Sequence, residues 1–188
     1  MGLDQDRARL RALLLERSVK FGTFTLASGQ TSNYYIDCRL TTMSAEGQVL
    51  IGRLGLAAIR KAGWALDAVG GLTMGADPVA YAIAAASFGS PPVVNAFSVR
   101  KNPKEHGTGR LIEGNFGPGF RVVVVEDVIT SGGSALRAVD AVRDQGGEVL
   151  GVLAVVDRQG EGRGRIEGAG VKVVVLETAG GLGLAQEA

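Results

Sequence analysis

Two adjacent acids, Glu126 and Asp127, are followed after two apolar residues by a short loop of glycines and hydroxyl residues, 130–134. When such a loop opens a helix, its backbone N–H groups and the helix dipole favour a bound phosphate. Carboxylates so near would repel a bare phosphate. Carboxylates do suit a ligand whose hydroxyls, or whose bound Mg²⁺ ion, lie a few ångströms from its phosphate. A ribose 5-phosphate has hydroxyls in this arrangement.

A strand and a helix must position this loop. Residues 122–125 are consecutive valines, typical of a strand buried on both faces of a parallel sheet. After the loop, apolar residues recur at helical spacing opposite a charged face. An ordinary strand–turn–helix with solvated acids is the alternative interpretation. The apolar positions are Ala135, Leu136, Val139 and Val142.

The composition indicates a globular protein of one domain. Of the 188 residues, 46% are hydrophobic and 21% charged, and 20 basic residues nearly balance 19 acidic ones. This balance gives no general attraction for nucleic acid or an anionic membrane. The single cysteine, Cys38, excludes an intrachain disulfide, and the single histidine, His106, excludes paired-histidine metal motifs. With no apolar leader or membrane-length run, we expect a cytoplasmic protein.

Apolar periodicity predicts alternating strands and helices from residue 66 onward. Pro78 should be the first residue of its helix, and residues 102–119 lack regular periodicity. We expect residues 157–170 to form a glycine-rich connection, with 161–167 a solvated loop. The predicted helices are 5–19, one capped by Ser44, 79–88 and one after 134; the predicted strands are 66–71, 92–99, 121–125, 148–156 and 171–176, with a hairpin-like piece near Ser28.

This alternation predicts a parallel sheet with helices on both faces. Ligands of such sheets bind at the carboxyl ends of the strands. Four loops should meet there and form the binding site: 72–78, 100–119, 126–134 and 157–165.

The stretch 121–134 resembles the signature of the phosphoribosyltransferases, in which hydrophobic residues, two acids and two hydrophobic residues precede a Thr-Ser-Gly-Gly-Ser-type loop. In that family the loop holds the 5-phosphate of phosphoribosyl pyrophosphate (PRPP), and the acids face the ribose hydroxyls.

Residues 100–107 place three cations and the only histidine in one loop. Alone, this segment is equally well a solvated basic loop. Beside a PRPP site, its cations could stabilise the negative charge that develops on a departing pyrophosphate. His106 could donate a hydrogen bond or a proton there.

This basic loop resembles the catalytic flap of the orotate phosphoribosyltransferases, and residues 24–37 resemble their N-terminal segment. Asp157-Arg158-Gln159 is similar to the site of their orotate-facing arginine, and residues 71–78 to their pyrophosphate loop. The resemblance spans about residues 21–159. It implies an α/β, type I phosphoribosyltransferase fold in one domain over 1–188. About residues 1–40 and the C-terminal segment would form a small hood.

The resemblance implies transfer of the phosphoribosyl group of PRPP to orotate, in de novo pyrimidine synthesis, with Mg²⁺ held mainly by PRPP and water. It also implies a homodimer that shares the flap, residues 100–119, across its interface. The implied catalytic residues are Lys104, His106 and Asp127. The implied PRPP-binding residues are Arg100, Lys101, Lys104, His106, Glu126, Asp127, Val128, Ile129, Thr130, Ser131, Gly132, Gly133 and Ser134. The implied orotate-binding residues are Tyr34, Tyr35, Thr130 and Arg158.

Two departures affect the substrate end of the site. Some members of the resembling family carry lysines where Ala27 stands and near Met74. Two alternatives stay open: a phosphoribosyltransferase for another base, and a non-catalytic PRPP-binding regulator. The chain has neither of the glycine motifs of nucleotide-dependent kinases and dehydrogenases. We expect Trp64 and Cys38 to be packing residues.

Overall fold

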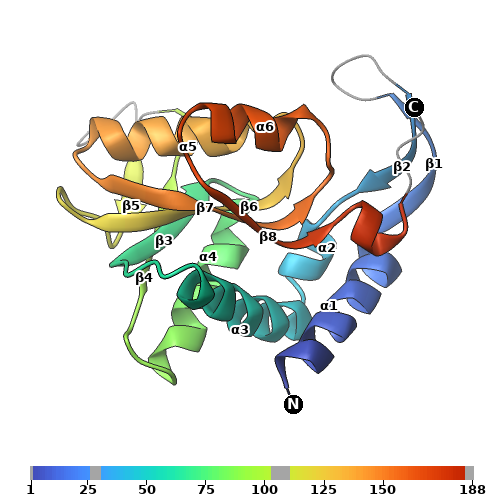
Figure 1. Cartoon of the computed structure of the whole chain (residues 1–188), viewed down its shortest axis with the longest axis horizontal. Helices are drawn as coiled ribbons and strands as arrows, with labels where there is room; N and C mark the ends of the chain where they lie inside the picture. Colours follow the sequence, from blue (N-terminus) through green and yellow to red (C-terminus); the bar gives the residue numbers. More distant parts are fainter. Residues whose placement is uncertain (1, 26–30, 103–110, 185–188) are drawn as a thin grey trace.

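The computed structural model describes residues 2–25, 31–102 and 111–184. The chain begins with α1 (Leu3–Arg17), which leads into an antiparallel pair of strands, β1 (Val19–Thr25) and β2 (Thr31–Ile36). A short helix, α2 (Arg39–Thr42), then leads into the main body. Figure 1 shows α1, β1 and β2 together at one side of the molecule.

The main body is a six-stranded sheet in the order β5-β4-β3-β6-β7-β8. Strands β3, β4, β6, β7 and β8 run parallel, and β5 pairs antiparallel with β4. The predicted parallel sheet is therefore confirmed, with one antiparallel edge. The strands are β3 (Ala68–Leu72), β4 (Asn95–Val99), β5 (Ile112–Gly114), β6 (Arg121–Ile129), β7 (Glu148–Asp157) and β8 (Val173–Thr178).

Helices cover both faces of this sheet, as the sequence predicts. Figure 1 shows α5 and α6 on one face and α3 and α4 on the other. Alternate valines of β6 point to opposite faces of the sheet. Val123 and Val125 pack into the core beneath α3 and α4. Val122 and Val124 pack into the core beneath α5 and α6. The helices are α3 (Ala45–Lys61), α4 (Ala76–Phe88), α5 (Gly133–Asp144) and α6 (Glu161–Gly168), with a 3₁₀ turn, η1 (Gly180–Leu182).

Three local predictions are wrong. Residues 161–167 form α6 rather than a solvated loop, because Ile166 is fully buried against the sheet. Residues 112–114 pair with β4, so the predicted irregular stretch contains β5. Helix α4 starts at Ala76, which makes Pro78 its third residue rather than its first. A proline is still tolerated in this first turn, whose N–H groups need no intrahelical acceptor.

Other local predictions hold. Ser44 caps α3 by accepting a hydrogen bond from the Gly47 N–H at 3.1 Å. Trp64 packs against the core, and Cys38 is 1% exposed. One boundary differs, because the first helix ends at Arg17 rather than Val19, which instead begins β1.

Helix α1 is tied to the main body by charged side chains. Asp6 is fully buried and pairs with Arg53 of α3 at 3.0 Å. Arg11 reaches the buried carboxylate of Glu177, at the end of β8, at 3.1 Å. Arg7 donates to the Leu176 carbonyl on the same strand at 3.2 Å.

Candidate active site

The site is built where four parallel strands end. Strands β3, β4, β6 and β7 run in the same direction, so their last residues lie along one edge of the sheet. Each is followed by one of the loops predicted to converge. The predicted meeting of these loops at the carboxyl edge is confirmed for the residues that the structure describes. Strand β6, at the centre, carries the two acids.

Both acids lie largely out of water. Glu126 is 6% exposed and Asp127 is 9% exposed. Burial, followed by the nearby negative charge of Asp127, raises the pKa of Glu126 to about 9. Asp127 accepts a hydrogen bond from the Val128 N–H at 2.8 Å through Oδ1. The fold therefore holds Glu126 as a neutral acid near pH 7.

The loop after β6 turns directly into helix α5. Gly132 takes the left-handed conformation, with φ of 75°, at the N-cap position, which favours glycine. The first turn of α5 contains no acidic residue. The surface is hollowed here by a pocket lined by Glu126 and residues 128–135. The N–H groups at a helix N-terminus within a pocket suit an anion the size of a phosphate.

Helix α6 supports this loop from behind. A Cβ atom added at Gly162 would lie 2.2 Å from the Thr130 carbonyl oxygen and 2.8 Å from the Gly132 nitrogen. A Cβ atom at Gly132 would in turn lie 2.6 Å from the Gly162 carbonyl oxygen. The two backbones therefore touch, and only glycine fits at either position without movement.

The loop after β3 lies against the acids. A Cβ atom at Gly75 would lie 2.7 Å from Oδ1 of Asp127, so this loop and β6 approach closely. Asp77 fixes the loop by accepting hydrogen bonds from Thr73 Oγ1 at 2.6 Å and from Ser98 Oγ, at the end of β4, at 2.7 Å. The Thr73–Met74 peptide bond is cis.

Arg158, just after β7, and Tyr34, on β2, join the main sheet to the N-terminal strands. The Arg158 guanidinium lies over the Tyr34 ring, 5.2 Å from its centroid, and its Nη2 is 3.5 Å from Ser32 Oγ. Tyr35 follows Tyr34 on β2 and therefore points to the other face of the strand. There its ring lies 5.6 Å from the ring of Phe24. The structure therefore brings Tyr34 and Arg158 into contact, whereas the Tyr35 side chain points away from both.

The flap is described only at its two ends. Arg137 of α5 donates a hydrogen bond to the Lys101 carbonyl at 2.8 Å, which ties the start of the flap to the helix that follows the predicted phosphate loop, residues 130–134. Arg100 lies 3.8 Å from the carboxylate of Glu113 on β5. Lys104, His106 and Ala27 lie outside the described residues, so their roles stay predictions.

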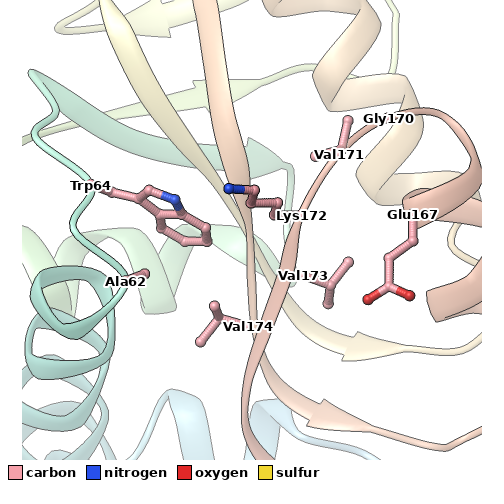
Figure 2. A pocket seen from close by; sticks show the side chains of 8 residues that line it. All are labelled: Ala62, Trp64, Glu167, Gly170, Val171, Lys172, Val173 and Val174. Atoms are coloured by element: carbon pink, nitrogen blue, oxygen red, sulfur yellow. The ribbon is translucent and has the colours of Figure 1, made fainter.

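A larger pocket of about 490 Å³ lies elsewhere. Figure 2 shows its lining side chains coming from the residues just after α3, from α6, and from the segment that leads into β8 together with the start of that strand. Because β8 runs parallel to its neighbours, its start lies at the amino edge of the sheet, opposite the acids. The lining residues are Ala62, Trp64, Glu167, Gly170, Val171, Lys172, Val173 and Val174.

The described residues contain neither a membrane-spanning helix nor a ready-made metal site. No helix there is long and apolar enough to cross a membrane. Nor does that part of the chain hold a group of three or more His, Cys, Asp or Glu side chains that could bind a metal. Cys38 is buried, and burial raises the pKa of its thiol well above its ordinary value.

Several positioning residues were not expected from the sequence. They include Asp77 with its two hydroxyl donors, Gly162 behind the phosphate loop, and Ser32 beside Arg158. A further link is made by Gln159, whose side-chain oxygen accepts a hydrogen bond from the Gly180 N–H at 2.6 Å. These contacts join segments far apart in the chain, and no local pattern signals them.

Comparison with known proteins gives a consistent result. A phosphoribosyl transferase domain model matches residues 47–178. The orotate phosphoribosyltransferase of Aquifex aeolicus is 47% identical over 91% of this chain and 94% of its own length. That of Mycobacterium tuberculosis is 50% identical over 89% of this chain and 90% of its own. A crystal structure of the M. tuberculosis enzyme in complex with PRPP superposes with a TM-score of 0.80 and 42% identity, covering 95% of this chain and 99% of the other.

Proposed function

We propose that this chain, which belongs to the orotate phosphoribosyltransferase family, transfers the phosphoribosyl group of PRPP to orotate and releases pyrophosphate. The product is orotidine 5′-monophosphate, an intermediate of de novo pyrimidine synthesis. One observation carries the proposal: the buried acid pair of β6 leads into a helix-capping glycine loop, beside a stacked Arg158–Tyr34 pair. These are a sugar-phosphate site and a site for a planar anionic base at one edge of the sheet.

PRPP would lie along the end of β6 with its 5-phosphate in the loop. Its phosphate oxygens would accept hydrogen bonds from N–H groups of residues 130–134, where the dipole of α5 adds positive potential. Glu126 and Asp127 would accept hydrogen bonds from the ribose hydroxyls. A carboxylate close to the sugar also stabilises the positive charge that develops on an oxocarbenium-like transition state.

Orotate would bind on the Arg158 side. The Arg158 guanidinium can form a charge-assisted hydrogen bond with the orotate carboxylate. Tyr34 is 3% exposed and lies beneath that guanidinium, so it would serve the orotate site mainly by holding Arg158 in place. Thr130, at the end of β6, would contact the base from the phosphate side. Tyr35 belongs to the proposed site less directly, since its ring lies on the opposite face of β2 with Phe24.

The flap would act on the leaving group. Arg100, Lys101, Lys104 and His106 would surround the pyrophosphate and stabilise its negative charge as the bond to the sugar breaks. The loop fixed by Asp77 would hold the same group from the β3 side. No side chain needs to act as a nucleophile, because a ring nitrogen of orotate attacks the sugar carbon directly.

Magnesium is part of the proposal. Mg²⁺ is a hard cation that prefers oxygen ligands and keeps several waters, so PRPP oxygens and water would be its main ligands. Asp127 offers carboxylate oxygens and the neutral Glu126 a carbonyl oxygen at the ribose, and oxygen donors of this kind suit Mg²⁺. When bound, the ion would neutralise negative charge on the pyrophosphate.

The functional unit would be a homodimer of single-domain chains that share the flap across their interface. The ties of α1 to α3 and β8 support a hood that moves with the main body as one domain. A cytoplasmic location belongs to the same proposal, and cell fractionation tests it.

A pyrophosphate-release assay tests the proposed reaction. Purified protein with PRPP and Mg²⁺ should release pyrophosphate when orotate is added, and not with adenine, hypoxanthine or uracil. Release with another base but not with orotate would make the chain a phosphoribosyltransferase of different specificity. PRPP binding without turnover on any base would favour a regulator.

A mixing experiment tests the shared flap. Lys104→Ala and Asp127→Asn should each lower kcat by about two orders of magnitude or more, the usual effect of removing transition-state stabilisation. In a heterodimer of the two variants, one of the two sites regains both groups if the flap acts in trans. Failure of a confirmed heterodimer to recover activity would place the flap over its own subunit's site.

A further inference from the structure

We infer that Gln159 is a positioning residue, which holds Arg158 at the base site through a hydrogen bond to the turn after β8. This inference rests on the proposed role of Arg158 in binding orotate. Gln159 touches neither the proposed substrates nor the reacting atoms. It acts on the backbone that carries Arg158.

The backbone at Gln159 is unusual. Its φ of 60° is the only positive value at a non-glycine residue of the described chain. This left-handed backbone conformation is unfavourable for glutamine, as it is for most residues with a Cβ atom. Such a conformation persists only where the surroundings hold it, and it is concentrated at functional sites.

Two hydrogen bonds hold Gln159 in place. Its N–H donates to Oδ1 of Asp157, a buried carboxylate, at 2.7 Å. Its side-chain Oε1 accepts from the Gly180 N–H at 2.6 Å. A Cβ atom at Gly180 would lie 2.7 Å from that same Oε1, so glycine at this position leaves room for the side chain.

The neighbouring backbone is anchored on both sides. The Arg158 N–H donates to the Ile129 carbonyl on β6 at 3.2 Å, and the Ala179 N–H donates to the Asp157 carbonyl at 2.8 Å. The turn that carries Arg158 is therefore hydrogen-bonded to β6 on one side and to the turn after β8 on the other. The left-handed step at Gln159 then redirects the chain toward α6, whose Gly162 touches the phosphate loop.

This arrangement explains why a residue with a long side chain is useful at a strained position. Glycine would adopt the same backbone without strain, but it could not reach the Gly180 N–H. Through its hydrogen bond with the Gly180 N–H, the Gln159 side chain links the backbone beside Arg158 to the turn after β8. The guanidinium can then be aimed at the Tyr34 ring with little freedom, which reduces the entropy lost on binding the base.

Two variants break the same contact from opposite sides. Gln159→Met keeps the side-chain length and the strained backbone but removes the acceptor, and Gly180→Ala pushes the acceptor away. Each should raise the KM for orotate about three- to tenfold, the size of one hydrogen bond's contribution, and leave the KM for PRPP within about twofold. Gly164→Ala is the matched control, because a Cβ atom there meets nothing within 4 Å.

The outcomes separate a positioning role from a general loss of stability. An unchanged KM for orotate in both variants would overturn the positioning role, as would a parallel rise of both KM values with a lowered melting temperature. A crystal structure of Gln159→Met supplies a readout independent of turnover, and Arg158 still stacked on Tyr34 would also contradict the inference. If the wild-type protein gives no orotate-dependent pyrophosphate release, the proposed function fails first and the inference fails with it.

Discussion

Glu126 is a carboxylic acid that the fold keeps away from water at the centre of a polar site. Its neighbour Asp127 adds negative charge, and together these effects raise the pKa of Glu126 to about 9. A neutral Glu126 can donate a hydrogen bond as well as accept one. The pair can therefore meet a sugar hydroxyl without presenting two full negative charges to a nearby phosphate.

This protonation makes stability depend on pH. The folded chain keeps a proton that the unfolded chain releases between pH 4.5 and about 9, so stability falls as the pH rises through that window. Glu126→Gln stays neutral and should gain stability over the wild type as the pH rises, on the order of a few kcal/mol near pH 8.

Urea unfolding at a series of pH values measures this effect. The difference in unfolding free energy between Glu126→Gln and wild type should widen from about pH 5 to about pH 9 and be constant below about pH 4. Parallel curves across the whole range would show that Glu126 ionises normally in the folded protein.

At the scale of elements, the sequence predicts what local patterns encode. The valine strand, the glycine loop and α5 were predicted because buried β-branched runs and helix-opening glycines are local signals. Helix α6 was missed, because three of its residues are glycines with poor helix propensity. It forms because Ile166 is buried and Gly162 packs against the phosphate loop, which are tertiary effects.

The candidate site likewise contains contacts that are local in sequence, which could be predicted, and contacts between distant segments, which could not. Only two residues separate the acids from the phosphate loop, so their proximity could be predicted from the sequence. The stacking of Arg158 on Tyr34 joins one residue near the start of the chain to another near its end. The resemblance to a known family suggested that both serve the base, but their contact depends on how the N-terminal strands pack against the main sheet.

Gly162→Ala tests the support that α6 gives to the phosphate loop. The new methyl group would lie 2.2 Å from the Thr130 carbonyl oxygen, so the loop or the helix must move. We expect the KM for PRPP to rise about tenfold or more, since displacements of this size disrupt bound geometry. Gly164→Ala, on the open side of the same helix, should leave it unchanged. Equal effects of both substitutions would mean that α6 matters only for general stability.

At the scale of the whole molecule, α1 is attached by ion pairs of very different burial. Asp6 is fully buried beside Arg53, whereas Arg9 and Glu46, 2.5 Å apart, are both well exposed. Both pairs connect α1 to α3. A buried carboxylate that keeps a partner is costly to disturb, while an exposed pair contributes little.

Arg53→Ala should lower the free energy of unfolding by about 2–3 kcal/mol, because the fully buried Asp6 carboxylate loses its counter-charge. Arg9→Ala, the matched change in the exposed pair, should cost less than about 1 kcal/mol. Urea unfolding of the two variants beside wild type gives both values. Similar losses would indicate that burial of the Asp6 pair does not distinguish it energetically.

PRPP and orotate should occupy opposite ends of one site along the carboxyl edge of the sheet. Steady-state kinetics of Arg158→Ala and Asp127→Asn, with each substrate varied in turn, measures this division of the site. We expect Arg158→Ala to raise mainly the KM for orotate, and Asp127→Asn, besides lowering kcat, to raise the KM for PRPP more than the KM for orotate. Wild-type kinetics in either variant, or the reverse pattern, would contradict this arrangement of the site.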